Sequence, residues 1–332
     1  MRIVIRSLTF LPKVGGLENM MHQLALAWAR QGHTVTVITA VPEEAEAQPY
    51  AVLRNPPESR VRQLLRKADL YVEANISLKT FRTGLRFRRK WVVIHHLTYL
   101  SYHWTGIAKR LLTLFAHNIC CSAYVAQTLP GKSVVIPNSY QPIFTKTNTG
   151  ERPYDFIFTG RMVSDKGLDV LIAAFLQYRQ IRPESRLLLV GDGPERATQQ
   201  ARVASAGMGD AVTWAGVLRG EALVAAYNSA KIAVIPSRWP EPFGIVALEA
   251  LACGCGVVAS NGGGLPEAVG SFGYYFKNGN IEELIMAMKQ AVADYPQFHD
   301  KFDAIQTYLQ QHTPEAIANA YLAQCKQWNL FN

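Results

Sequence analysis

The stretch that decides the fold is Pro236–Glu267, PSRWPEPFGIVALEALACGCGVVASNGGGLPE. It predicts a strand end, a proline-rich turn, a helix from about Phe243 and a short strand at 256–260, closed by a glycine-rich loop at 261–264. Prolines 240 and 242 suit the turn, because the first-turn amides of a helix have no intrahelical acceptor.

The expected helix start offers an anion site. The backbone N–H groups of Phe243, Gly244 and Ile245 point out of the helix, where its dipole favours negative charge. Gly244, with no side chain, leaves room for a ligand to approach the backbone. The turn therefore predicts a phosphate-binding site.

Two carboxylates flank this turn. Glu241 and Glu249 are eight residues apart, which is roughly 12 Å along a helix. Carboxylate pairs that hydrolyse a glycosidic bond stand about 5–9.5 Å apart, so the spacing favours two grips on a long ligand. The plain alternative makes Glu241 a dipole partner of the helix and Glu249 a solvated helix residue.

The motifs E-P-F-G-x-x-x-x-E (241–249) and V-V-A-S-x-x-G-G-L-P-E (257–267) resemble those of the retaining sugar-nucleotide glycosyltransferases of family 4. The resemblance implies the α/β GT-B fold, with two Rossmann-like parallel-sheet domains facing an interdomain cleft. It implies a nucleoside-diphosphate sugar as donor, with no metal or other cofactor. Glu249 would hold the ribose hydroxyls and Glu241 a hydroxyl of the donor sugar.

A second motif, G-R-x-x-x-x-K-G at 160–167, follows an expected strand at Asp155–Thr159. The resemblance places Arg161 and Lys166 on the donor diphosphate, beside the amides of the 243–245 helix start. Fixed cations at a strand end would stabilise the charge that a departing diphosphate gains. Isolated Arg and Lys residues are otherwise solvated surface.

The chain begins with a strand, a glycine loop, a helix and a second strand, which predicts a βαβ unit. The loop contains Gly15 and Gly16 but lacks G-x-G-x-x-G, so it does not indicate a dinucleotide site. The resemblance places these glycines near the donor phosphates and the acceptor; the alternative is an ordinary tight turn.

Two histidines, His95 and His96, follow an expected strand at Lys90–Ile94. Carboxyl ends of strands are where open α/β sheets bind ligands. The family commonly has a histidine at this strand end, near the donor sugar, and IHHL matches it best at His95. We therefore expect His95 to be catalytic, although a lone histidine is more often a satisfied core residue.

Charge divides the chain unevenly. Residues 1–150 contain 19 Lys and Arg against 7 Asp and Glu, whereas residues 151–332 contain 15 against 18. Basic residues recur at helical spacing between 79 and 90, which predicts a basic amphipathic helix carrying Lys79, Arg82, Arg86 and Arg89. Such a helix suits an anionic membrane surface or a phosphorylated acceptor, or is simply solvated. Nucleic acid is not expected, because no nucleic-acid motif accompanies the charge.

Composition fixes the broad class. The 332 residues are 49% hydrophobic and 18% charged, as in a core-forming chain of two domains. No apolar run is long enough to span a membrane, and the start is too charged for a signal peptide, so we expect a cytoplasmic protein, peripheral on the inner membrane face if the basic helix binds there. Five cysteines without secretory context predict neither disulfides nor a zinc site.

We expect domain 1–145 on the acceptor side, domain 146–313 on the donor side, and a last helix from Pro314 that packs back on the first domain. Where the family usually has I-P-N-G-V-D, this chain has IPNSYQ at 136–141. The predicted activity is retaining transfer of a sugar to an acceptor, such as a lipid-linked or phosphorylated glycan precursor. A sugar-nucleotide epimerase or hydrolase, and a non-catalytic binding subunit, are the alternatives.

Overall fold

The computed structural model describes residues 1–13, 15–100, 103–147 and 150–331. The chain forms two compact units, one of Met1–Ser139 with Gln311–Asn332 and one of Tyr140–Gln310. Each unit is built on one parallel sheet with helices, which confirms the predicted fold of two Rossmann-like domains.

The first unit has seven strands in the order β3-β2-β1-β4-β5-β6-β7. Its strands are β1 (Arg2–Ser7), β2 (Thr34–Thr39), β3 (Ala51–Arg54), β4 (Leu70–Ala74), β5 (Trp91–His95), β6 (His117–Cys120) and β7 (Ser133–Val135). Its helices are α1 (Gly16–Arg30), α2 (Glu58–Lys67), α3 (Phe81–Arg86), α4 (Trp104–Leu112), α5 (Ala123–Ala126) and α13 (Pro314–Gln327).

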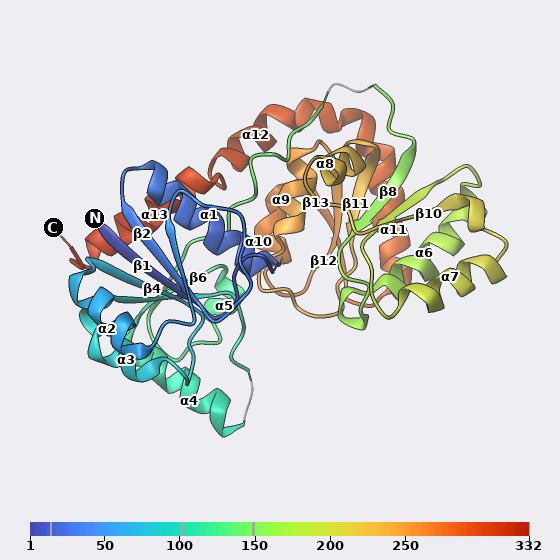
Figure 1. Ribbon diagram of the computed structural model, residues 1–332. Helices are drawn as coiled ribbons and strands as arrows, with labels where there is room; N and C mark the ends of the chain where they lie inside the picture. The colour runs from blue at the N-terminus through green and yellow to red at the C-terminus, as the bar shows by residue number, and fades with distance from the viewer. Residues whose placement is uncertain (14, 101–102, 148–149, 332) are drawn as a thin grey trace. The chain divides into compact units, whose positions relative to one another are not determined.

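Helix α13 completes the core of the first unit, although it comes last in the chain. It packs against α1 (Figure 1). The indole Nε1–H of Trp28 donates to the carbonyl oxygen of Ala318 at 3.2 Å, and the ring of Tyr321 meets the indole edge to face. Both aromatic side chains are fully buried, so α13 is part of the unit's hydrophobic core.

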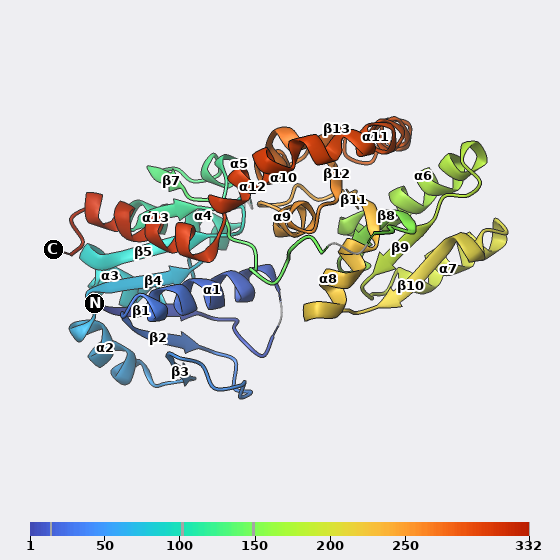
Figure 2. The same cartoon turned by 90° about the horizontal axis from the view of Figure 1, so that it is seen from above.

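The second unit has six strands in the order β10-β9-β8-β11-β12-β13. They are β8 (Tyr154–Thr159), β9 (Leu187–Val190), β10 (Val212–Gly216), β11 (Ala230–Ile235), β12 (Gly256–Ser260) and β13 (Gly273–Phe276). The helices are α6 (Leu168–Ile181), α7 (Arg196–Ser205), α8 (Gly220–Asn228), α9 (Ile245–Ala252), α10 (Leu265–Val269), α11 (Ile281–Asp294) and α12 (Phe302–Gln310). Helices α6 and α11 pack side by side (Figure 2).

The basic helix expected between residues 79 and 90 is shorter than predicted. Only α3 (Phe81–Arg86) is α-helical, and a 3-10 turn at Arg88–Lys90 follows. Lys79 and Arg89 therefore lie outside the helix. The helix is held against the sheet at Gly84, where a Cβ atom would lie 2.4 Å from the indole of Trp91, and the chain must then turn into β5.

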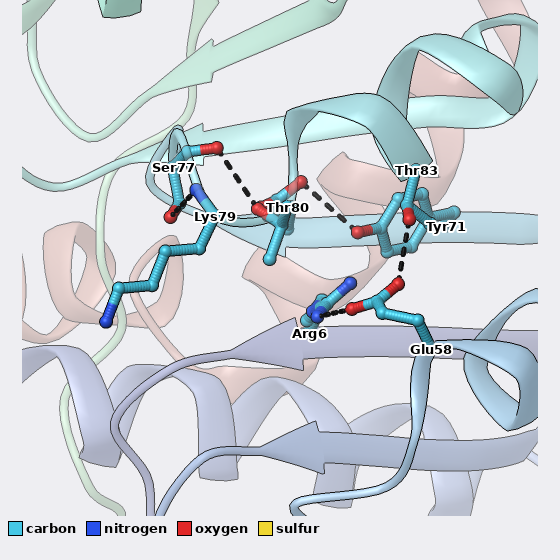
Figure 3. A network of polar contacts seen from close by, with 8 residues as sticks. Arg6, Glu58, Tyr71, Ser77, Lys79, Thr80 and Thr83 are labelled. Carbon is cyan, nitrogen blue, oxygen red and sulfur yellow. Dashed lines mark hydrogen bonds and ion pairs between the residues drawn. The ribbon is translucent and has the colours of Figure 1, made fainter. Parts of the chain in front are cut away.

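A polar network fixes the inner face of α3 (Figure 3). The buried carboxylate of Glu73 accepts hydrogen bonds from Thr80 and from Trp91 Nε1, the latter at 2.9 Å. Glu58 accepts from Thr83 at 2.9 Å and pairs with Arg6. Because Thr80 and Thr83 are buried against the sheet, the basic side chains of residues 79–89 are exposed to solvent.

Candidate functional site

The carboxyl ends of β8 and β11 mark the topological switch point of the second sheet. These strands are central neighbours, and the chain leaves β8 toward β9 on one side before returning to β11 on the other. Open α/β sheets bind ligands in the crevice beside such a point. The two segments that follow these strands, 160–168 and 236–244, contain most of the predicted donor-site residues.

These two segments are locked together through their backbones. The N–H groups of Arg238 and Trp239 donate to the carbonyl oxygen of Asp165 at 2.9 and 3.1 Å. Gly167 has φ +68°, and a Cβ atom there would lie 2.0 Å from the carbonyl oxygen of Pro236. Only glycine fits both the dihedral angle and this close approach.

The lock brings Lys166 and Glu241 into a direct ion pair. Lys166 Nζ lies 2.5 Å from Glu241 Oε1, and the same oxygen accepts a hydrogen bond from Ser237 Oγ at 2.7 Å. The side chains are 30% and 13% exposed, so the pair is screened only in part. Ser237 was missed from the sequence, because no motif distinguishes it from an ordinary turn serine.

Arg161 lies on the same β8–α6 segment and is exposed. Within the described residues its guanidinium has no acidic partner, unlike Lys166. The segment thus presents one unpaired cation and one that a carboxylate holds in place. A bound diphosphate could be met by both.

A third segment, the glycine-rich loop 261–264 that follows β12, contacts the backbone of Glu241. The N–H of Gly264 donates to the carbonyl oxygen of Glu241 at 2.7 Å, and a Cβ atom on Gly263 would lie 2.3 Å from that oxygen. The glycine-rich loop therefore has a packing role here. Because Glu241 lies in this bridge, outside α9, the helical spacing assumed between Glu241 and Glu249 does not apply.

Helix α9 begins at Ile245, two residues later than predicted, and Gly244 is its N-cap with φ +105°. The space beside Gly244 is not left open for a ligand as expected: a Cβ atom there would lie 2.4 Å from Cδ2 of Leu265. Gly244 is needed for its positive φ and for this contact. Phe243 is buried. The start of α9, like Lys166 and Glu241, follows the carboxyl ends of the central strands β8 and β11.

Glu249 is an interior residue and not a solvated one. It is 9% exposed, and its burial raises the pKa of the carboxyl group to about 7. The hydroxyl of Tyr227 hydrogen-bonds to it and also lies 2.5 Å from Thr159 Oγ1 at the end of β8. The chain Thr159–Tyr227–Glu249 connects the helix to the first strand of the unit.

The site residues predicted in the first unit lie at the carboxyl ends of that unit's own strands. Gly15 is the N-cap of α1, and Gly16 is the first residue of that helix, after the carboxyl end of β1. A Cβ atom on Gly15 would lie 2.4 Å from Glu18 Oε2. The two glycines therefore begin α1 close to an acidic side chain.

His95 and His96 differ in what their rings can do. His95 is fully buried, with Nε2 bound to Asn118 Oδ1 at 3.0 Å and Nδ1 to the hydroxyl of Tyr99 at 2.9 Å. Burial lowers its pKa to about 4. His96 Nε2 is buried without a partner in the described part of the chain, and burial lowers the pKa of that ring to about 3. Both ring nitrogens of His95 are therefore engaged with neighbouring side chains. In the described part of the chain, only His96 of the two has a ring nitrogen without a hydrogen-bond partner.

The described residues offer neither a metal-binding cluster nor a membrane-spanning helix. No group of three or more His, Cys, Asp or Glu side chains among them is arranged to hold a metal ion. Among the same residues, no helix combines the length and the apolarity that crossing a bilayer requires. The five cysteines all lie in the described ranges, where each is buried and none forms a disulfide.

Comparisons with known proteins bear on both units. The family described as Glycosyl transferases group 1 matches residues 139–305, and Glycosyltransferase Family 4 matches residues 14–140. A lipopolysaccharide 1,2-N-acetylglucosaminetransferase of Salmonella typhimurium is 28% identical over 62% of this chain and 60% of its own length. A glycogen synthase of Mycobacterium tuberculosis is 27% identical over 81% of this chain and 80% of its own.

A similar solved structure is that of HepE from Anabaena, determined in complex with UDP and glucose. It is 21% identical, covers 98% of this chain and 99% of its own, and has a TM-score of 0.80. At this identity the likeness shows the fold alone, which is the GT-B type built from two Rossmann-like domains.

Proposed function

Because this chain belongs to the group 1 glycosyl transferases, we propose that it moves a sugar from a nucleoside-diphosphate sugar to an acceptor with retention of configuration and without a metal. The observation that carries the proposal is the arrangement of Arg161, Lys166 and Glu241 at the switch point of the second sheet. Two cations there can stabilise the diphosphate as it leaves.

Different residues of the site bind different parts of the donor. Arg161, Lys166 and the first-turn amides of α9 bind the diphosphate, since both cations and helix starts favour anions. Glu241 takes a sugar hydroxyl and Glu249 the ribose hydroxyls. The pair with Glu241 holds Lys166 in position before the donor binds. The donor diphosphate then gives this lysine a second anionic partner.

In this mechanism the chain itself offers no nucleophile. The leaving phosphate oxygen takes the proton of the acceptor hydroxyl as that oxygen attacks the anomeric carbon on the face the phosphate vacates. The bond to the diphosphate breaks and the new glycosidic bond forms on the same face, so the anomeric configuration is kept. The cations of the site stabilise the diphosphate product.

For the acceptor, we propose a lipid-linked or phosphorylated glycan precursor of the cell envelope. The similarity to a lipopolysaccharide N-acetylglucosaminetransferase supports this class. The HepE complex with UDP and glucose supports a nucleotide-sugar donor. Lys79, Arg82 and Arg86 are exposed cations in the first unit that suit an anionic acceptor.

The proposal is tested by calorimetry with UDP, GDP and ADP, followed by a product screen with the matching sugar nucleotides. Proton NMR of the new glycoside gives its anomeric configuration, and the assay is repeated with EDTA. We expect binding, a retained configuration and no loss with EDTA. An inverted product refutes retention, and free sugar or an epimerised donor as the only product assigns the alternative activities.

A further inference from the structure

Helix α4 carries its apolar side chains outward. Of its nine residues Trp104–Leu112 only Gly106 is buried, and the 3-10 turn Thr113–Phe115 follows directly. The large apolar residues of this segment face solvent: Trp104 (74% exposed), Ile107 (45%), Leu111 (54%), Leu114 (53%) and Phe115 (52%). A surface helix normally has the reverse pattern, with its apolar stripe toward the core.

These five residues form one strip, which we call the α4 ridge. Residues 104, 107, 111 and 114 have the spacing of one helical face, since an α-helix has 3.6 residues per turn. Gly106 and Thr113, both buried, lie seven residues apart on the opposite face. The carbonyl oxygen of Thr113 accepts a hydrogen bond from Asn118 Nδ2 at 2.9 Å, which fastens this inner face to β6.

The surroundings of the ridge are positively charged. Residues 74–150 contain no Asp or Glu at all. Lys109 and Arg110 are half-buried on the two sides of α4, between the ridge and the inner face. Long basic side chains so placed can extend their charged ends along an apolar surface toward anions.

A second group of cations belongs to the same unit. The network of Figure 3 holds Thr80 and Thr83 toward the sheet, and Lys79 extends away from it. Arg82, Arg86, Arg88 and Arg89 are exposed as well. The unit therefore combines an exposed apolar strip with exposed basic side chains. Both lie within residues 74–150, which contain no acidic residue.

We propose that the α4 ridge binds the surface of an anionic lipid bilayer, with its apolar side chains at the boundary between the headgroups and the acyl chains. Tryptophan suits this boundary, because its ring is apolar at one end and polar at the other. An interfacial helix binds through apolar area together with electrostatic attraction to anionic lipid. The ridge is short, so the attraction of nearby Lys and Arg makes binding reversible and salt-dependent.

The test is sedimentation of the full chain with vesicles of phosphatidylglycerol and phosphatidylcholine, against vesicles of phosphatidylcholine alone. The variant Ile107→Ser/Leu111→Ser should bind the anionic vesicles about tenfold or more weakly, because two apolar side chains no longer leave water. The matched control is Ile181→Ser, which replaces an equally exposed residue of the second unit and should bind as the native chain does. Both variants should melt as the native chain does.

A second measurement reports on the ridge in an unaltered fold. Brominated lipids should quench the native fluorescence, and Trp104→Phe should remove most of that quenching. Unchanged vesicle binding by Ile107→Ser/Leu111→Ser, or equal quenching with and without Trp104, overturns the proposal. So does a native dimer in lipid-free ultracentrifugation that the double variant converts to a monomer, since the ridge would then join two copies.

Discussion

Burial of one carboxyl group makes stability depend on pH. The pKa of Glu249 is raised from 4.5 to about 7 by desolvation, so between these values the folded chain keeps a proton that the unfolded chain releases. Stability should therefore fall as pH rises from about 4.5 to 7, by about 3 kcal/mol if the whole difference is expressed. Below that window the contribution of Glu249 is constant.

Glu249→Gln should remove most of this slope, which urea unfolding at pH 5 and pH 8 measures. The matched control is Glu151→Gln, an exposed acid of the same unit, which should leave the slope as it is. A native slope in Glu249→Gln would show that the carboxyl group titrates normally.

If Lys166 binds the diphosphate as proposed, Lys166→Ala should lower kcat by about 10²–10³, because the transition state loses one of its fixed cations. Lys231→Ala is the control: Lys231 forms a similar ion pair, 2.8 Å from Asp155, in the same unit but near the amino end of β11. Steady-state kinetics should show near-native turnover for the control. Equal losses in both variants would point to folding instead of diphosphate binding.

Gly167→Ala should destabilise the second unit more than Gly207→Ala does. Both glycines have a left-handed φ, +68° and +65°, which costs roughly 1 kcal/mol or more for alanine. Only at Gly167 would the new Cβ atom also strike a backbone oxygen, that of Pro236. Denaturant midpoints compare the two, and equal midpoints would mean that the two segments can separate freely.

At the scale of elements, α13 can be tested through one residue. Tyr321 is fully buried and its hydroxyl has no hydrogen-bond partner in the described part of the chain. Tyr321→Ala should cost about 3–5 kcal/mol by leaving a cavity beside Trp28. Tyr321→Phe should be neutral or stabilising, because it removes an unsatisfied buried hydroxyl. A loss of stability in Tyr321→Phe, measured by thermal unfolding, would show that the hydroxyl is bonded in solution.

The strands were the most predictable elements. Segments 91–94 (WVVI) and 232–235 (IAVI) are continuous apolar runs, as parallel strands buried on both faces require. By contrast β3 is a short, half-buried edge strand, and it was not predicted. Helix α4 was not predicted, although residues 104, 107, 111 and 114 have helical spacing. Spacing alone could not show that this apolar stripe faces solvent.

The helix cap at Asn280 shows how far local rules reach. Asparagine is a favoured N-cap residue, and the Asn280 side chain accepts a hydrogen bond from the N–H of Glu283. Glu283, however, reaches the N–H of Lys277 and the side chain of Asn280, where a capping box would use the N–H of Asn280. In the site, likewise, Lys166 and Glu241 could be named from motifs, but their pairing and the part of Ser237 depend on strands β8 and β11 lying side by side.

At the scale of the whole molecule, two separate cores should unfold in two steps. A chain of two domains need not unfold in a single transition, so calorimetry should resolve two. Tyr321→Ala should lower only the transition of the first unit. Excess UDP should raise mainly the transition of the second unit, because the residues proposed to bind the diphosphate belong to that unit. One transition that moves as a whole in both experiments would show that the units unfold together.

The first unit is closed by residues 311–332, which follow the whole of the second unit in the chain. A ribosome therefore releases every strand of the first sheet long before it releases the helix that covers Trp28. At about 5–20 residues per second the intervening segment takes many seconds to emerge. During synthesis the second unit therefore has its complete sequence first. Until α13 emerges, the apolar surface around Trp28 that this helix covers stays exposed, where chaperones can shield it.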